Sequence, residues 1–222
     1  MTTFGAPNLL ALLDDTERAS LSALGQRRSY RDQEVIHERG DVGASLSIVI
    51  EGRVSLHRIL SNGSIIFASS VMAGQNYADA ASFSGGARTH RAIAQGATIV
   101  DHFDSAAFQE ILDHHPSVLK ALYLISAYRL NLAIEMLDDT RILPTRVRLA
   151  KMILRMAKSS PLKGAVPGRQ EDLGQILGLS TVSVIQNLKM LAAEGLIATG
   201  YRQIKVPDLD RLELWIKSLD WD

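Results

Sequence analysis

Apolar residues recur along this chain at spacings that change from one region to the next. Over residues 8–25 they recur at helical spacing, which predicts short helices that end at Gly25. Over residues 29–103 short apolar and β-branched runs alternate with glycine-containing turns, which predicts a meander of strands forming a barrel or roll. Asn62 and Gly63 lie between two such runs and predict a hairpin with a type I′ turn.

A long helix is predicted over residues 117–143, after a short helix capped at Asp104 or Ser105. Its apolar positions follow the four- and three-residue steps of a heptad, interrupted only by Arg129. A helix of about 26 residues is roughly 39 Å long, which is more than one small domain covers. We therefore expect a homodimer, and packing against the roll of the same chain is the alternative. The residues predicted for the dimer interface are Val118, Leu122, Ile125, Leu132 and Met136.

Pro144 ends the long helix and marks a boundary. An amphipathic helix follows, then a loop over residues 159–168, two short helices, a pair of strands and a terminal helix after Pro207. The predicted domains are a roll with N-terminal helices (1–112), a dimerisation helix (113–143) and a C-terminal domain (144–222).

The most specific pattern lies in residues 170–197. Gly174 sits inside the first helix of this segment at a cost of about 1 kcal/mol relative to alanine, so we expect close packing at that position. Gly178 follows at the turn, and Ser180 is placed to cap the second helix. A small residue, a turn glycine and a serine cap in this order predict a helix-turn-helix that binds DNA. An ordinary helical hairpin is the alternative.

The second helix of such a motif enters the major groove, where its outer side chains meet base edges and phosphates. Gln186 is suited to adenine, and Val182 is suited to a thymine methyl group. Arg202 lies in a predicted hairpin that would form a wing beside this helix. Asn187 occupies a position that is usually apolar, and the pattern offers no reason for it. The residues predicted to contact DNA are Arg169, Gln170, Ser180, Thr181, Val182, Ser183, Gln186, Lys189 and Arg202.

Charge and composition narrow the function classes. The 24 basic and 24 acidic residues cancel, but residues 144–207 hold 10 basic and 3 acidic residues, which is the pattern expected for a polyanionic partner, with a solvated surface as the equal alternative. The chain has no cysteine, which excludes disulfides, thiolate zinc sites and cysteine-ligated iron–sulfur clusters. No apolar run approaches the roughly 18 residues of a membrane helix, so we expect a soluble, cytoplasmic protein without a membrane partner.

Taken together, these segments resemble the Crp/Fnr superfamily of bacterial transcription regulators over nearly the whole chain. The resemblance implies an α+β protein with an N-terminal cyclic-nucleotide-binding-like β-roll, a long central dimerisation helix and a C-terminal winged helix-turn-helix. It also implies a homodimer that binds palindromic, double-stranded promoter DNA and is able to contact RNA polymerase. The segments that carry it are IHERGDVGASLSIVIEGRVSLHR, SNGSIIFASSVMAGQ, RLNLAIEMLDD, TRVRLAKMILRMA and QEDLGQILGLSTVSVIQNLKMLAAEGLI.

The resemblance also implies an effector site in the roll. Relatives that bind nucleotides use a Gly-Glu pair for the ribose and an Arg-Ser or Arg-Thr pair for the cyclic phosphate. This chain keeps Arg88 and Thr89, and an arginine beside a hydroxyl suits an anion. The first pair is replaced by Ala78 and Asp79. The residues predicted for the effector site are Asp79, Arg88 and Thr89.

The adenine contacts of the nucleotide-binding relatives are also missing. Those relatives place hydroxyl residues on the long helix, where this chain has Ala133 and Ile134. Losing these hydrogen-bond partners argues against tight binding of cyclic AMP. Three alternatives stay open: the roll binds a cyclic nucleotide weakly, binds another small molecule, or acts as a ligand-free scaffold.

No other cofactor and no metal site are indicated, and a haem sensor is a minor alternative that would use His37, His57, His90 or His102. We expect a protein that is not an enzyme, because the chain lacks GxSxG, GxxxxGK[ST] and HExxH motifs. Relatives often have an Arg-Glu pair after the serine cap of the second helix and a further Arg four or five residues on. This chain has Thr181, Val182 and Gln186 in those places, so we expect a different DNA target. Val182 and Ile185 are both apolar on this helix, which is also compatible with contact to another protein. A protein-docking module that has lost DNA binding is therefore the second function considered.

Overall fold

The computed structural model describes the chain apart from residues 1–6, 43, 64, 79–82, 84–85, 161–163, 168–169, 201–202 and 220–222. The chain divides into two compact units, residues 1–131 and 132–222. The division falls inside the long helix α4 (Pro116–Ile142). The sequence instead placed boundaries after residues 112 and 143, of which the first lies inside α3 (Ser105–His114).

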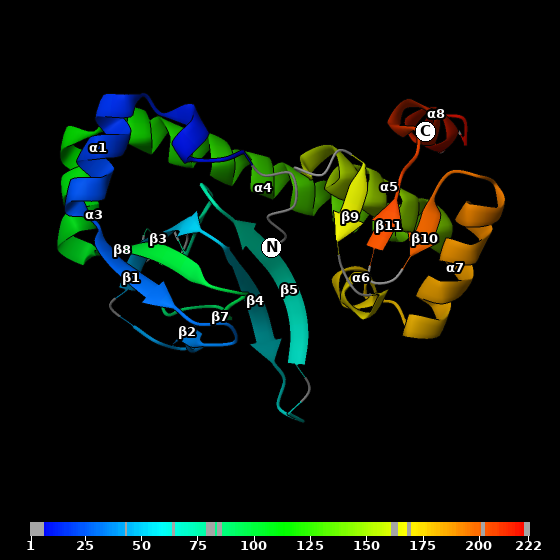
Figure 1. Ribbon diagram of the computed structural model, residues 1–222, viewed down its shortest axis with the longest axis horizontal. Helices are drawn as coiled ribbons and strands as arrows, with labels where there is room; N and C mark the ends of the chain where they lie inside the picture. The colour runs from blue at the N-terminus through cyan, green and yellow to red at the C-terminus, as the bar shows by residue number, and fades with distance from the viewer. Residues whose placement is uncertain are drawn as a thin grey trace. The chain divides into compact units, whose positions relative to one another are not determined.

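The first unit contains two four-stranded antiparallel sheets, which confirms the predicted roll (Figure 1). The strand order is β1-β8-β3-β6 in one sheet and β2-β7-β4-β5 in the other. The strands are β1 (Gln26–Tyr30), β2 (Val35–His37), β3 (Ala44–Glu51), β4 (Arg53–Ile59), β5 (Ile65–Met72), β6 (Asn76–Tyr77), β7 (Arg91–Ala94) and β8 (Thr98–Asp104).

The interior of the roll is an apolar cluster with members from both sheets. Val49 and Val100 from one sheet and Val54 and Val71 from the other are fully buried in it. Alternate residues of a strand face opposite sides, so Ile48 belongs to a second cluster on the outer face of the first sheet. The roll interior is therefore lined by side chains of both sheets.

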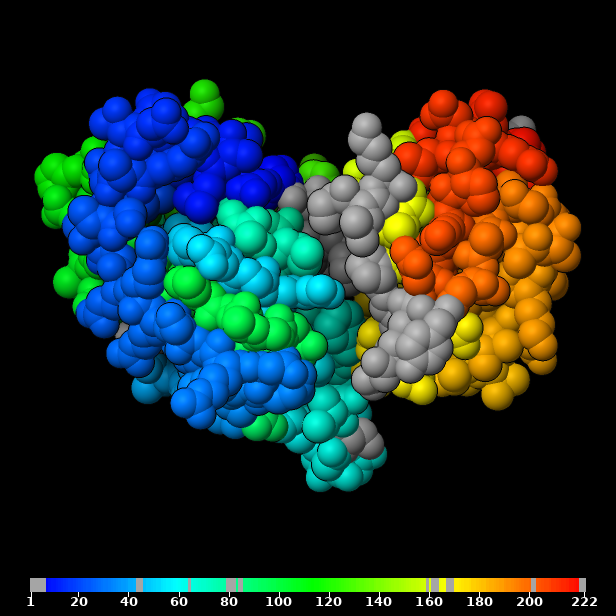
Figure 2. All heavy atoms as spheres, viewed as in Figure 1, coloured from blue at the N-terminus to red at the C-terminus, as the bar shows by residue number. Residues whose placement is uncertain are grey.

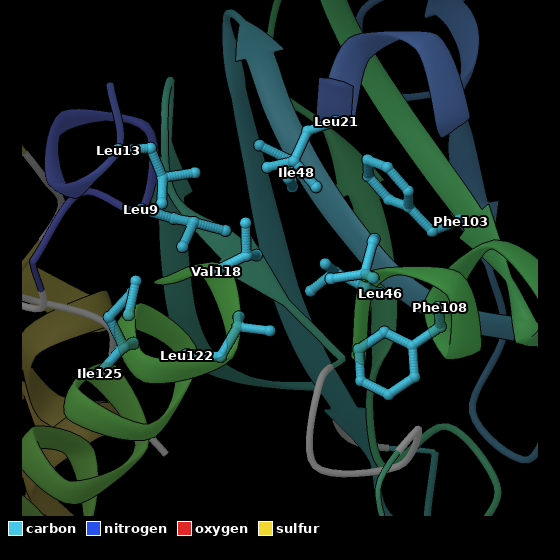
Figure 3. Packing of buried hydrophobic residues seen from close by; sticks show 12 residues of the cluster. Leu9, Leu13, Leu21, Leu46, Ile48, Phe103, Phe108, Val118, Leu122 and Ile125 are labelled. Carbon is cyan, nitrogen blue, oxygen red and sulfur yellow. The ribbon is translucent and has the colours of Figure 1, made fainter. Parts of the chain in front are cut away.

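Four helical segments cover that outer face: η1 (Leu10–Leu12), α1 (Asp15–Leu24), α3 and the first part of α4. Asp14 caps α1 and Asp104 caps α3, each by accepting a hydrogen bond from a backbone N–H of the first turn. Figure 3 shows the resulting cluster, in which side chains of α4 lie beside Leu9 and Leu13.

Three residues of the predicted dimer seam lie in this intrachain core. Val118, Leu122 and Ile125 have no exposed surface within the single chain, and Leu132 is 5% exposed outside this cluster. Packing within the chain, the alternative given above, therefore accounts for Val118, Leu122 and Ile125. Met136 is half-buried.

Arg129, the polar interruption of that seam, is buried as well. Its Nη2 donates hydrogen bonds to the backbone oxygen of Asn76 at 2.7 Å and to Asn76 Oδ1 at 3.3 Å. A buried guanidinium needs such partners. The arginine therefore ties α4 to strand β6 instead of disturbing a dimer contact.

The opposite side of α4 carries a second apolar pattern, and this one is exposed. Its positions follow steps of four, three, four and three residues along the helix, which keeps them on one face. We call this set the outer seam of α4. Its members, with exposed fractions where the side chain is large, are Tyr123 (71%), Ala127, Leu130 (54%), Ile134 (49%) and Leu137 (60%).

The hairpin predicted at Asn62 and Gly63 is present as the connection between β4 and β5. Its turn differs from the prediction, because Gly63 has a φ of +80° whereas Asn62 is not among the residues with positive φ. Five residues separate the two strands, and the Gly63 N–H donates to the Leu60 oxygen at 2.9 Å. A two-residue type I′ turn is therefore wrong for this hairpin.

The second unit contains α5 (Thr145–Ser159), α6 (Gln170–Leu177), α7 (Thr181–Ala193), α8 (Leu209–Lys217) and a three-stranded antiparallel sheet (Figure 1). The predicted strand pair is confirmed as β10 (Ala198–Gly200) and β11 (Gln203–Lys205). Part of the predicted loop is a third strand, β9 (Ala165–Pro167), which pairs with β11. Val166 is 1% exposed there, so burial outweighed the flanking glycine and prolines.

By length and composition, no single helix in the described part of the chain qualifies to cross a membrane. The helices α6 and α7 pass that test only as a pair, and they are bent by 108° at the break between them.

Candidate nucleic-acid interface and effector site

The steep crossing of α6 and α7 depends on Gly174. The two helices are bent by 108°, within the range of helix-turn-helix motifs. A Cβ atom on Gly174 would lie 2.7 Å from the backbone oxygen of Leu179, and the Leu179 N–H donates to the Gly174 oxygen at 2.7 Å. The predicted need for a small residue here is confirmed, since no side chain fits between these backbones.

The turn between the helices has the predicted caps. Gly178 has a φ of +67°, a left-handed conformation that glycine adopts without strain. Ser180 precedes α7, and its side chain accepts from the Ser183 N–H at 3.2 Å. From α5, Arg148 Nη2 donates to the Leu177 oxygen at 2.8 Å, which satisfies the end of α6. The start of α7 is thus held at a defined position.

Helix α7 has a buried and an exposed side, as its pattern predicted. Val184, Leu188 and Leu191 are at most 1% exposed. On the other side, Val182, Gln186 and Lys189 are separated by four and three residues, so they share one face, and all three are exposed. Figure 2 shows the atoms of α7 (orange) at the molecular surface.

Four further residues that the sequence predicted to contact DNA lie in the described part of the chain. Thr181, Ser180 and Gln170 are exposed, whereas Ser183 is half-buried. Met190 is 43% exposed beside the outer face of α7, and sequence reasoning did not select it. Met190 directly follows the predicted contact residue Lys189 in the sequence, and this position could have identified it.

Asn187 now has a structural reason. It is 9% exposed, and its Nδ2 donates to the Ser183 oxygen at 2.8 Å within α7. An amide at this position therefore packs on the buried side while bonding one turn back along its own helix.

Much of the basic excess of this unit is neutralised within the chain. Lys151 pairs with Glu135 at 3.1 Å and Asp139 at 2.7 Å, and Arg155 pairs with Glu135 at 3.0 Å. Arg146 pairs with Glu194 at 2.6 Å. These cations join α5 to α4 and to the end of α7, and they contribute little to the field outside the protein.

Among the described cations of this unit that form no ion pair, Arg148 on α5 is half-buried and Arg211 on α8 is exposed. In the part of the chain that the structure describes, Lys189 on α7 and Lys205 on β11 are exposed and form no ion pair. Lys205 was missed by sequence reasoning, although it alternates with buried Ile204 in the strand. Arg169 and Arg202, which were predicted to contact phosphates, lie outside the described residues.

In the roll, the predicted effector arginine is buried. Arg88 is 5% exposed, and burial lowers the pKa of its guanidinium. Thr89 is exposed, and its hydroxyl lies 2.9 Å from His90 Nδ1. Asp79 lies outside the described residues. Of the predicted set, the structure therefore places Arg88 alone in the interior.

Ring side chains and a serine surround this region of the roll. Ser47 is the strand neighbour of both Tyr77 and His102. The Ser47 hydroxyl lies 3.0 Å from His102 Nδ1, and the Tyr30 hydroxyl lies 2.8 Å from His102 Nε2. His37 stacks on Tyr77 with ring centroids 5.8 Å apart. These residues come from five different strands, which is why sequence spacing gave no sign of the cluster.

Acid should destabilise the first unit through these histidines. Burial, with a further contribution from nearby arginines, lowers the pKa of His37 and of His102 from 6.5 to about 4. Between these values the unfolded chain binds protons that the folded chain does not, so stability present above about pH 6.5 is lost as the pH falls toward 4. Thermal melts from about pH 7 to about pH 5 measure this loss. His102→Gln should flatten the dependence and exposed His114→Gln should not; equal slopes for the two variants would contradict the assignment.

Two family models match the chain. One, described as "Cyclic nucleotide-binding domain", matches residues 27–115, and the other, described as "Crp-like helix-turn-helix domain", matches residues 147–215. The first range contains the roll, and the second contains the α6–α7 motif and the wing.

Curated relatives and solved structures agree with these matches. The cyclic AMP receptor protein of Thermus thermophilus is 26% identical over 209 residues, which covers 94% of this chain and 96% of the relative. The transcriptional regulator LdrP of Thermus thermophilus is 26% identical over 194 residues, covering 84% and 94%. The structure of FixK2 from Bradyrhizobium japonicum is similar in fold, with a TM-score of 0.70 at 22% identity, covering 86% of this chain and 96% of FixK2.

A cyclic-nucleotide-binding-type roll followed by a winged helix-turn-helix defines a DNA-binding transcription regulator. Both parts of the chain match family models of this kind of regulator, and the resemblance to the Crp/Fnr superfamily stated from sequence is confirmed.

Proposed function

We propose that this regulator acts as a homodimer that inserts α7 of each copy into the major groove of a palindromic site. The proposal is carried by the exposed face of α7, where Val182, Gln186 and Lys189 lie together after a 108° turn. An exposed valine in the middle of a polar helix face is explained by contact with a thymine methyl group. A protein-docking module gives no reason for the unpaired Lys189 and Lys205 beside it.

The outer seam of α4 supports the homodimer. It is apolar, exposed and spaced as one face of a coiled coil, and an unpaired seam of this kind is typical of a helix that packs against a second copy. Two copies related by a two-fold axis would present the same seam to each other. This face replaces the buried face of α4 that the sequence suggested.

Selection of bound duplexes from random DNA tests the proposal. The expected product is an inverted repeat whose half-site centres are about 34 Å apart, one turn of the duplex. A single unrepeated half-site would remove the dimer arrangement. No enrichment of any sequence, even at low salt, would favour the docking module.

Replacing Gln186 with Ala should relax the preference at one base pair, because a glutamine on this face pairs with a single base edge. The expected loss of discrimination there is about 1–3 kcal/mol, with affinity for random DNA nearly unchanged. Competition binding with single-base variants of the selected site measures this. An equal loss on specific and random duplexes would contradict a base contact.

Lys189→Ala is the matched change on the same face. It should weaken binding to all sequences and lower the slope of log affinity against log salt by about one. Titrations of one specific and one random duplex over a series of salt concentrations measure the slope, and an unchanged slope would contradict a phosphate contact.

We further propose that the roll responds to a small effector other than cyclic AMP. Ala78 supports this, since it has a φ of +68°, a conformation that glycine adopts freely but that is strained for alanine. It stands where nucleotide-binding relatives carry the residues for the ribose. Ala133 and Ile134 on α4 also lack hydroxyls for a base. The name of the Thermus relative refers to cyclic AMP, so cyclic AMP is the ligand against which other effectors are compared.

A further inference from the structure

The C-terminal end of α7 is bonded to side chains of two other helices. Part of this end is satisfied within its own segment, since the Leu196 N–H donates to the Leu191 oxygen at 3.0 Å. The oxygen of Glu194, the residue that follows α7, instead accepts from Arg211 Nη2 of α8 at 2.9 Å. An arginine at this place also puts a positive charge at the negative end of the helix dipole, which stabilises the last turn of α7.

The side chain of Glu194 makes a second bond at the same end of the helix. Arg146 of α5 donates from Nη1 to Glu194 Oε1 at 2.6 Å, and its guanidinium lies 5.3 Å from the ring centroid of Trp215 on α8. The side chains of Arg146 and Glu194 are 34% and 38% exposed, so water screens this pair only in part. Glu194 is therefore joined to α8 through its backbone and to α5 through its carboxylate.

Helix α8 is itself anchored on α5. The two helices pack against each other, and Leu212 of α8 is fully buried. Glu213 of α8 forms an ion pair with Lys158 of α5. The start of α8 is capped by Asp208, whose Oδ1 accepts from the Arg211 N–H at 2.9 Å. The two arginines that reach Glu194 thus extend from helices that are bound to each other.

A groove separates the end of α7 from α8. Its volume is about 530 Å³, and it is lined by Glu194, Leu196, Arg211, Leu214, Trp215 and Ser218. Leu214 is 67% exposed at this groove. Along the groove, polar bonds take the place of close packing, so the bonds of Arg211 and Arg146 fix how far the end of α7 lies from its support.

We propose that Arg211 and Arg146 are positioning residues for DNA recognition, which act through Glu194 by fixing the C-terminal end of α7. The turn at Gly174 already fixes the other end of this helix. A helix held at one end only is free to tilt, and hydrogen bonds to base edges weaken steeply when their geometry changes. The two arginines thus determine how sharply α7 distinguishes sequences, without contacting the bases themselves. This inference rests on the proposed function, because it concerns the reading of DNA by α7.

Arg211→Met in the full chain tests the bond to the Glu194 oxygen. The ratio of the affinities for the selected duplex and for a random duplex should fall about 10-fold, because each copy loses one charge-assisted hydrogen bond while the Arg146 bond remains. Arg211→Lys keeps the charge and a donor, and it should recover most of the ratio. Gel-shift titrations of both duplexes at one salt concentration, well below the melting temperature, measure the ratio. An unchanged ratio in Arg211→Met would overturn the role of Arg211.

Lys217→Met is the matched control, since it removes a positive charge from the same helix. The Lys217 side chain is 70% exposed and pairs with Glu213 of its own helix at 3.0 Å. This variant should keep the ratio of the parent. A fall in Lys217→Met as large as that in Arg211→Met would mean that the charge of α8, and not the bond to α7, changes DNA binding, and it would overturn the proposal.

Two substitutions of Glu194 test the bond from Arg146. Glu194→Gln keeps an oxygen that accepts from Arg146, whereas Glu194→Ala removes it, and both keep the backbone oxygen for Arg211. Glu194→Ala should lower the ratio about 5-fold and Glu194→Gln by less. Equal ratios in the parent and in Glu194→Ala would overturn the role of Arg146.

Hydrogen exchange of the free protein gives a readout that does not depend on DNA. In Arg211→Met the amides of residues 190–196 should exchange faster than in the parent, while those of α6 and of the three-stranded sheet keep their rates. Uniformly faster exchange throughout the second unit would indicate general destabilisation and would overturn a positioning role.

Duplex selection with the parent protein separates this inference from the proposed function. If the parent selects an inverted repeat and Arg211→Met discriminates as well as the parent, only the positioning role is removed. If the parent selects no sequence, the proposed function is removed and this inference with it.

Discussion

Replacing Leu130 with Glu is expected to convert the dimer into a monomer and to weaken binding to the palindromic site about 100-fold, because each half-site is then bound separately. Leu130 lies at the middle of the outer seam of α4 and is 54% exposed in the single chain. A dimer would bury the remaining exposed half of Leu130 in both copies, at about 0.8–1.6 kcal/mol for each, and glutamate would place two charges against each other. Sedimentation equilibrium and gel-shift titration measure the two effects.

Two other leucines serve as controls for this change. Leu12→Glu alters an exposed leucine of η1, 46% exposed, and should leave both the mass and the DNA affinity unchanged. Leu122→Glu puts a charge into the fully buried cluster and should unfold the first unit. A Leu130→Glu protein that stays dimeric would show that the outer seam is not the interface.

Gly174→Val is expected to disrupt the α6–α7 motif and to weaken specific DNA binding. A Cβ atom at residue 174 would lie 2.7 Å from the Leu179 oxygen, and valine adds two further carbons at the same place. Forcing the two backbones apart should destabilise the second unit by about 3 kcal/mol and weaken DNA binding by about 100-fold. Thermal unfolding and gel-shift titration measure these losses.

Gly200→Ala is the matched control, because its Cβ would lie 3.7 Å from the Gln203 oxygen, an ordinary contact. This variant should keep the melting temperature of the parent within error. Normal DNA affinity in Gly174→Val would mean that the close approach of the turn is dispensable.

The DNA-binding motif was predicted well because its determinants are local. Gly174, Gly178 and Ser180 lie within seven consecutive residues, and each acts through a neighbour close in sequence: a near backbone, a left-handed φ, a capped N–H. Residue identity therefore directly predicts steric and hydrogen-bonding requirements of this short range. Asn187 is the exception, since a buried amide bonded to its own helix follows no pattern of apolar spacing.

The polar interior of the roll was predicted only in part. Arg88 was found through the resemblance, but His37, Tyr77 and His102 come from different strands and meet through sheet pairing. Register across long-range strands depends on which faces become buried, and single-residue motifs do not encode it. The strand β9 was missed for the same reason, since Val166 pairs with Ile204 far along the chain.

The sequence by itself determined the order of most elements, the caps of α3 and α7, the turn glycines of the α6–α7 motif and the class of regulator, because each of these depends on neighbouring residues or on long specific segments. Only the tertiary structure decided which face of α4 is available to a second copy. Both faces are apolar at three- and four-residue steps, so periodicity does not distinguish them. Leu9, Leu46 and Phe108, distant in sequence, cover Val118, Leu122 and Ile125, and burial by these residues leaves Leu130 and Leu137 exposed.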